Sequence, residues 1–310
     1  MLSMSLLFSR ASSRPFDIHH LNLSAGELAP KFHRRRSAVG EESCPARASA
    51  NFPASTLAGG TEGVTKLGLM AYFQENHADK YLELDLESRV DRQLTLLEIR
   101  HILKEIQIEG PILDLGYGHG IVTTELLERF GSCSVVEASR RLCEVALKSH
   151  PVGLKVHHSL FEDFQPTHRY KTIFATAVLH HLKHPLEALT KFVDWLEPDG
   201  TLIISVPNGH SIHRALGYSL GIQNSIDAMT VTGKKSGVAH VLTPGAVRKM
   251  ISSTRLEVVR EIDSFVKILS NLQMASFSED QLSSLFELSQ IVPRDFHATS
   301  IFQCGLKSSS

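Results

Sequence analysis

The sequence has few cysteines, almost no net charge and no long hydrophobic run. Its four cysteines in 310 residues lack the paired spacing of a zinc site and the density of a disulfide scaffold, so we expect a reducing compartment and no metal site. A formal net charge of -1 argues against a broad nucleic-acid surface. No apolar run reaches the roughly 18 residues that span a bilayer, so we expect no membrane partner and a cytoplasmic protein. The hydrophobic share of 42% is enough for one sizeable core.

Residues 1–64 lack the apolar periodicity of a folded domain. They are rich in serine, alanine and glycine, and the cluster 34–36 is all arginine. This composition predicts a disordered extension. Arginine and serine with few acids are also typical of a transit peptide, so a mitochondrial location is the alternative. Residues 65–310 are expected to form the folded domain.

The folded region changes its periodicity near Gly110. Before that point, helical spacing over 65–108 predicts helices that precede the first strand. Beyond it, short apolar strands alternate with helical stretches, which predicts βαβ units and an α/β fold with a parallel sheet. The segment from Pro207 to Leu242 shows no regular pattern. The expected strands are 111–116, 133–138, 154–159, 172–177, 201–207, 256–262 and 300–306, and the expected helices are 121–130, 140–150, 185–196, 243–253 and 280–291.

A carboxylate and three alternate glycines lie where the first strand turns into a helix. The loop carries Asp114, Gly116, Gly118 and Gly120. Glycine there permits a sharp turn, close approach of a ligand to the backbone, and close helix packing. A dinucleotide loop, G-x-G-x-x-G, would need a glycine at Ile121, and an acid beside it would repel pyrophosphate. Asp114 suits a ligand with a cationic ammonium group, which disfavours an NAD-dependent oxidoreductase.

Glu137 ends the second predicted strand. A carboxylate at this place, one βα unit after the glycine loop, can accept hydrogen bonds from both ribose hydroxyls. Glu137 therefore indicates a nucleoside ligand without choosing between NAD and another nucleoside.

Five segments, in this order, resemble those of the class I S-adenosylmethionine-dependent methyltransferases: DLGYGHG, VVEAS, HHSLFEDF, AVLHHLKHP and LEPDGTLIISVPN. The likeness runs from about Met70 to Leu306. It implies S-adenosylmethionine as cofactor and a Rossmann-like sheet, mostly parallel with an antiparallel final strand, under a helical cap. By the resemblance, 65–108 would form the N-terminal helices, 109–207 the donor-binding half, and 208–310 the acceptor-side cap and final strands.

The resemblance also implies which residues contact the donor. Asp114 and the three glycines would surround its methionine part, and Glu137 its ribose. Leu160 stands where the family often has an aspartate, which leaves the adenine amino group to the backbone or to Glu162. The remaining expected contacts are Phe161 at the adenine, Ala177 and Val178 along the cofactor, and Tyr81 over the methionine carboxylate. Tyr81 and Phe161 could equally be packing residues.

Methyl transfer needs an aligned acceptor, and a hydroxyl acceptor also needs a base. The candidate bases are His181, His213 and His240. His181 has the alternative role of holding its loop by a backbone hydrogen bond. His180 replaces the glutamate that ubiquinone-biosynthesis O-methyltransferases carry there, which argues against the metal site of those enzymes. We expect O-methylation of a small molecule; N- or C-methylation and a non-catalytic, nucleoside-binding regulatory subunit remain open, as does the oligomeric state.

Overall fold

The structure is a computed structural model that describes residues 78–308 except residue 84. All of these residues belong to one compact unit of the chain, residues 60–310. The predicted N-terminal extension, and the first part of the helices predicted over 65–108, lie outside the described residues.

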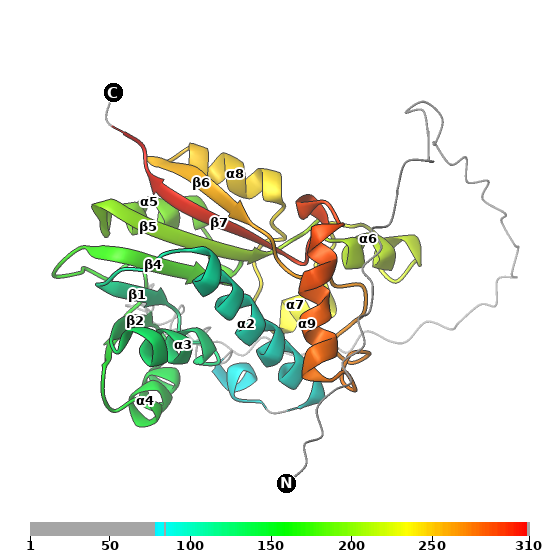
Figure 1. The fold of residues 1–310 in the computed structure, drawn as a ribbon, viewed down its shortest axis with the longest axis horizontal. Coiled ribbons are helices and arrows are strands. Elements are labelled where there is room, and N and C mark those ends of the chain that lie inside the picture. Colours follow the sequence, from blue (N-terminus) through cyan, green and yellow to red (C-terminus); the bar gives the residue numbers. More distant parts are fainter. Residues whose placement is uncertain (1–77, 84, 309–310) are drawn as a thin grey trace, which may run out of the picture. The chain divides into compact units, whose positions relative to one another are not determined.

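One seven-stranded sheet forms the centre of the fold, in the order β3-β2-β1-β4-β5-β7-β6 (Figure 1). The pairs among β1 to β5 are parallel, whereas β7 runs antiparallel to both β5 and β6. This confirms the predicted mostly parallel sheet with an antiparallel final strand. The strands are β1 (Ile112–Leu115), β2 (Cys133–Glu137), β3 (Leu154–His158), β4 (Tyr170–Thr176), β5 (Leu196–Pro207), β6 (Leu256–Ile262) and β7 (Thr299–Leu306).

Helices cover both faces of the sheet because its central strands are apolar on both sides. Ile112, Phe174 and Ile203 pack on one face with residues of α2 and α3, whereas Leu113 and Ile204 pack on the other with α5 and α8. The helices are α2 (Leu86–Glu105), α3 (Ile121–Phe130), α4 (Arg140–Ser149), α5 (Pro185–Asp194), α6 (Ile212–Ser219), α7 (Val231–Lys235), α8 (Pro244–Ser252) and α9 (Glu279–Glu287), with helical residues 78–82 and 3₁₀ turns at Leu179–His181, Leu288–Gln290 and Arg294–Phe296.

The expected irregular segment after Pro207 contains two helices, α6 and α7, which the sequence did not predict. The side chain of Arg214 explains how this segment is ordered. Its guanidinium donates to the carbonyl oxygens of Gly209, Ile226 and Ala228 at 2.6–3.1 Å, so one cation ties α6 to the loop that follows it. Such a network depends on tertiary contacts and leaves no periodic signal.

The cluster His180, His181 and His184 precedes α5 and does not form part of that helix. Leu179–His181 form a 3₁₀ turn, Leu182 is extended, and α5 starts only at Pro185, with His184 as its N-cap. Proline favours the first turn of a helix and disfavours helical backbone in the residue before it, so the break falls at His184.

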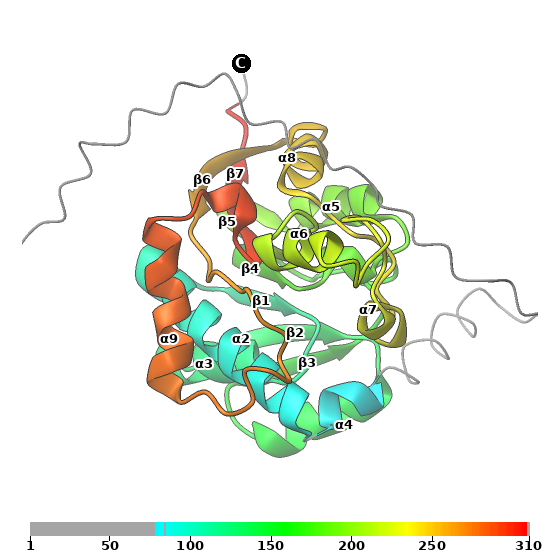
Figure 2. The ribbon, with the colours of Figure 1, turned by 90° about the vertical axis from the view of Figure 1, so that its right-hand side faces the viewer.

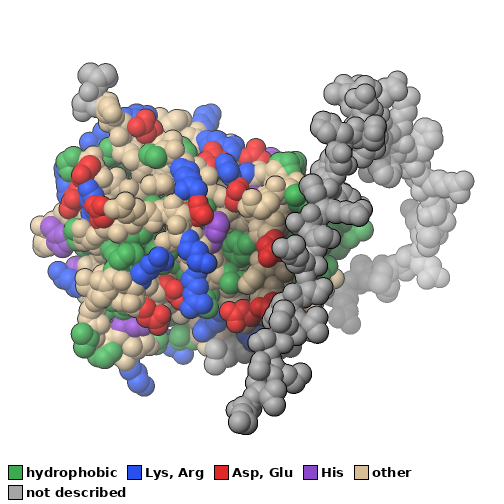
Figure 3. Space-filling view, in the orientation of Figure 1, with side chains coloured by type: hydrophobic (Ala, Val, Ile, Leu, Met, Phe, Trp, Pro, Cys, Tyr) green, Lys and Arg blue, Asp and Glu red, His purple; other side chains and the backbone are tan. Residues whose placement is uncertain are grey.

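The surface seen in Figure 3 mixes both charge signs, with Lys and Arg side chains interspersed among Asp and Glu. Among the described residues, no helix is both long and apolar enough to cross a membrane.

Candidate functional site

The glycine loop follows β1 at the carboxyl edge of the sheet, where ligands of open α/β sheets bind. Gly116, Gly118 and Gly120 all have positive φ, at +83°, +50° and +75°. The Gly116 amide donates to the Val136 carbonyl at 2.9 Å, which ties the loop to β2. A Cβ on Gly120 would lie 2.5 Å from the hydroxyl oxygen of Tyr117, so any side chain at that position would displace the Tyr117 ring.

Asp114 is fully buried at the end of β1. The Thr123 hydroxyl of α3 donates to its Oδ2 at 2.7 Å, whereas its Oδ1 has no hydrogen-bond partner in the described part of the chain. Burial, and secondly the charge of Glu137, raises the pKa of Asp114 to about 7. An unpartnered buried carboxylate oxygen is costly, and a cationic ligand group would compensate it.

Glu137 binds the glycine loop from the end of β2. Its Oε2 accepts from the Tyr117 amide at 2.8 Å and its Oε1 from the Ser139 amide at 2.7 Å. Burial raises the pKa of Glu137, and the Ser139 and Tyr117 amides oppose that shift. Sequence reasoning did not anticipate this clamp. Each carboxylate oxygen has a second lone pair, so Glu137 keeps acceptor capacity for a ligand hydroxyl.

Tyr81 lies against the glycine loop. Its ring centroid is 5.1 Å from that of His119, and its ring carbons are 3.7 Å from where a Cβ of Gly118 would be. Arg92 of α2 donates to the Tyr81 carbonyl at 2.8 Å, while its Nε is buried without a partner among the described residues. Burial raises the pKa of Tyr81 to about 12, so its hydroxyl is neutral. Arg92 was missed from the sequence, because an arginine on a helix is usually a surface residue.

The expected adenine contacts follow β3, beside the end of β2. Glu137 pairs with His158, and the Ser159 amide donates to the Glu137 carbonyl at 3.0 Å, so Leu160 comes next along this edge. Phe161 packs edge-on against Phe192 of α5, with ring centroids 5.7 Å apart. Phe161 therefore has the core contact that its alternative interpretation required.

The end of β4 carries backbone strain next to the loop. Ala177 has φ +55°, and it is the one non-glycine residue with positive φ in the described range. The conformation costs an alanine about 1–2 kcal/mol. The Ala177 amide donates to Ser205 of β5 at 2.8 Å, and the Val178 side chain lies 3.8 Å from where a Cβ of Gly116 would be. Strain of this kind gathers at functional sites.

Two of the candidate bases, His181 and His240, contact backbone carbonyl oxygens through their ring nitrogens. His181 Nδ1 lies 3.2 Å from the Gly237 carbonyl oxygen, and His240 Nε2 lies 3.2 Å from that of Lys183. The His180 carbonyl also accepts from the amides of Ala239 and His240. These contacts join the 3₁₀ turn after β4 to the segment before α8, so the side chains of His181 and His240 hold the two segments together.

His213 lies in the first turn of α6, just beyond β5. Its Nδ1 is 3.4 Å from the Ser211 hydroxyl. Burial, followed by the charges of Lys267 and Arg214, lowers the pKa of His213 to about 4. The imidazole is therefore neutral near pH 7 and keeps a lone pair that can accept a proton. In the part of the chain that is described, no three His, Cys, Asp or Glu side chains gather as a metal site.

Glu98 is a second residue that the sequence did not single out. It lies on α2, and its carboxylate accepts from Ser205 of β5 at 2.7 Å and from Ser264, beyond β6, at 3.1 Å. Burial raises the pKa of Glu98 against these hydrogen bonds. Glu98 thus ties α2 to the strand ends at the carboxyl edge.

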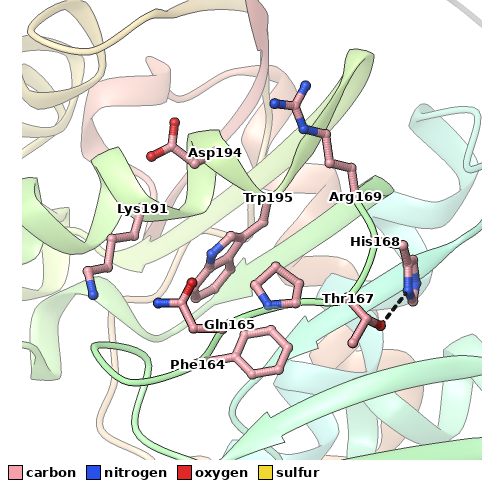
Figure 4. Close-up of a pocket in the computed structure, with 9 residues that line it drawn as sticks. Phe164, Gln165, Thr167, His168, Arg169, Lys191, Asp194 and Trp195 are labelled. Atoms are coloured by element: carbon pink, nitrogen blue, oxygen red, sulfur yellow. Dashed lines mark hydrogen bonds between the residues drawn. The ribbon is translucent and has the colours of Figure 1, made fainter.

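An open cleft of about 470 Å³ lies at the opposite edge, next to the start of β4 (Figure 4). Phe164 and Trp195 form its apolar part, and Thr167 and His168 lie beside it, with the Thr167 hydroxyl 3.3 Å from Nδ1 of His168. The cleft contains none of the residues around the glycine loop.

The family model described as "Methyltransferase domain" matches residues 85–260. Trans-aconitate 2-methyltransferase of Sinorhizobium fredii is 33% identical over 101 residues, which is 32% of this chain and 39% of that protein. Malonyl-[acyl-carrier protein] O-methyltransferase of Halalkalibacterium halodurans is 32% identical over 102 residues, 30% of this chain and 38% of that protein. The chain thus spans about two fifths of the length of these two relatives.

Longer but weaker likenesses extend over more of the chain. Ubiquinone biosynthesis O-methyltransferase of Rickettsia bellii is 25% identical over 209 residues, 61% of this chain and 84% of that protein. Among solved structures, N-methyltransferase NodS from Bradyrhizobium japonicum in complex with S-adenosyl-L-homocysteine has a TM-score of 0.46 at 14% identity, covering 76% of this chain and 99% of that chain.

Proposed function

Because the chain belongs to the methyltransferase domain family, we propose that it is an S-adenosylmethionine-dependent methyltransferase that acts on a small-molecule acceptor. The observation that carries the proposal is the buried Asp114 carboxylate, with one unpartnered oxygen, beside three glycines with positive φ. That combination suits a ligand that presents an ammonium group to the carboxylate and lies close to the loop backbone. The amino group of the donor's methionine part is such a group.

The other donor contacts follow from the same edge of the sheet. Glu137 would accept from the ribose hydroxyls with its remaining lone pairs, while it keeps the Tyr117 and Ser139 amides. The unpartnered Nε of Arg92, whose guanidinium also donates to the Tyr81 carbonyl, would bind the methionine carboxylate. We place Leu160 and Phe161 at the adenine, and Ala177 and Val178 along the rest of the donor.

The donor, when bound, supplies an activated methyl group and its own leaving group. The protein must then align the acceptor and exclude water, a contribution that reaches about 7–11 kcal/mol in well-oriented reactions. His213 is the proposed base for a hydroxyl acceptor, because its ring nitrogen lies at the Ser211 hydroxyl, whereas His181 and His240 contact backbone carbonyls. Two of the relatives are named as O-methyltransferases, which supports oxygen as the accepting atom. N- and C-methylation are the alternatives.

We also propose a cytoplasmic location, with a mitochondrial one if the N-terminal segment is a transit peptide. The proposed partner is the small-molecule acceptor, with neither nucleic acid nor a membrane.

Calorimetry with S-adenosylhomocysteine, and separately with NAD, tests the donor site. We expect binding of the former alone, and affinity losses of roughly 10- to 150-fold in Asp114→Ala and in Glu137→Ala, as for a lost hydrogen bond to a charged group. Glu128→Ala, an exposed acid on α3, is the control that should bind normally. Failure of the wild-type protein to bind S-adenosylhomocysteine would refute the proposal.

Labelled donor incubated with a metabolite extract separates an enzyme from a regulatory subunit. Labelled product that disappears in Asp114→Ala supports catalysis. Donor binding without product across broad extracts supports the non-catalytic alternative.

A further inference from the structure

Lys267 lies in the segment between β6 and α9, on the acceptor side of the fold. Figure 2 shows this segment in orange, running from the end of β6 toward the first turn of α2. Asn271 contacts α2, because its side-chain amide donates to the Glu87 carbonyl at 3.4 Å. The neighbours Phe265 and Leu269 belong to an apolar cluster with α2 and α9. The lysine is thus presented by a packed segment.

The positive charge of the Lys267 ammonium is only partly balanced by its neighbours. It is half-buried, and its Nζ donates to Asn271 Oδ1 at 2.6 Å, a neutral acceptor. Within the described residues it forms no ion pair, and the charges of Asp91 and Glu87 act on it only through space. Burial lowers the pKa of Lys267 against these two charges. An ammonium has three donors, so two remain for another partner.

Lys267 is also close to the residues of the proposed active site. Its charge is the largest electrostatic influence on His213, the proposed base. Asp91, which acts on Lys267, also acts on Tyr81 and on His119 of the glycine loop. Hydrogen bonds agree with this proximity. The Ala298 amide donates to the Phe265 carbonyl, and the Ala298 carbonyl accepts from the Asn208 amide just before α6, both at 2.9 Å, so the segment that carries Lys267 is joined to the one that carries His213.

We propose that Lys267 binds an anionic oxygen group of the acceptor, a carboxylate or a phosphate, and that the acceptor's reacting atom lies toward His213. The inference rests on the proposed function, because it assigns the substrate class of the same site. A partly desolvated cation without an ion-pair partner destabilises the free protein, and a bound anion would offset this cost. The apolar cluster beside Lys267 favours an acceptor whose body is apolar.

The test compares three probes by calorimetry on protein saturated with S-adenosylhomocysteine: benzoate, its neutral analogue benzamide, and phenyl phosphate. We expect benzoate or phenyl phosphate to bind at least about 10-fold more tightly than benzamide, as for a charge-assisted hydrogen bond. Whichever anion binds more tightly identifies the carboxylate or the phosphate source. Lys267→Gln should remove the preference, Lys267→Arg should keep it, and Lys148→Gln, an exposed lysine on α4, is the matched control.

Three results would overturn the inference. One is equal affinity of the wild-type protein for the anions and for benzamide. Another is an anion preference that persists in Lys267→Gln. The last is a loss of S-adenosylhomocysteine affinity in that variant, since it would assign Lys267 to the donor. Absent binding of S-adenosylhomocysteine to the wild-type protein would instead refute the proposed function, and the probes would then be titrated against the protein alone.

Discussion

Replacing Asp114 with asparagine should stabilise the ligand-free protein at alkaline pH. The pKa of Asp114 is about 7 in the folded protein, against an ordinary value of 3.8 that applies to the unfolded chain. The folded state therefore holds the proton more tightly, so stability is greatest below about pH 4 and falls as the pH rises through 7. The difference between the two pKa values corresponds to roughly 4 kcal/mol at pH 8.

Asparagine resembles the protonated carboxyl group in shape and in carrying a donor, and it cannot ionise. Its oxygen can still accept from the Thr123 hydroxyl, as Oδ2 of Asp114 does. Asp114→Asn and the wild-type protein should thus be about equally stable near pH 4. At pH 8 the variant should be more stable by up to about 4 kcal/mol. The same change should weaken S-adenosylhomocysteine binding by roughly 10- to 150-fold, because the charge that would bind the ammonium is gone.

Urea unfolding between pH 4 and 8.5 measures this difference. The chain has one tryptophan, Trp195, which is buried, so its fluorescence reports loss of the core. Asp163→Asn, at an exposed aspartate, is the control and should show no such trend. A stability gain that is independent of pH, or a loss at pH 8, would show that the pKa of Asp114 is not raised in the folded protein.

Two further predictions concern the loop and the proposed base. Gly120→Ala should lower the free energy of unfolding by about 2–4 kcal/mol, because of the positive φ and the displacement of Tyr117. Its control, Gly131→Ala, has φ +77° but open space around it, so it should lower the free energy of unfolding by only about 1–2 kcal/mol in the same urea titration. Equal losses in the two variants would contradict the steric argument. Because the pKa of His213 is about 4, protonation of this base should not lower the methyl-transfer rate between pH 8 and 6. A fall in rate with a midpoint near the ordinary pKa of 6.5, abolished by His213→Gln, would contradict the burial of His213.

Local chemistry in the sequence was enough to predict the sheet and the glycine loop. The strand Ile112–Leu115, within the predicted 111–116, is buried along its whole length, and α3 spans the predicted residues 121–130. The helix predicted over 243–253 is α8; Thr243 is its N-cap and accepts from the Ala246 amide at 3.2 Å, and Pro244 is its first residue. These features depend on neighbours within a few residues, so periodicity and capping patterns reveal them.

The acceptor side required the tertiary structure. Helix α6 and its following loop depend on the hydrogen bonds of Arg214, and His181 and His240 meet carbonyls more than 50 residues away. Arg92, Glu98 and Lys267 have no local motif, and each has its environment only because α2 and the segment after β6 pack at the carboxyl edge. The sequence by itself determined the fold and the positions of Asp114, Glu137 and the glycines, because strand and loop chemistry is local. Only the tertiary structure decided which histidine is free of backbone contacts and which cations lie beside it, because burial and long-range partners set those properties.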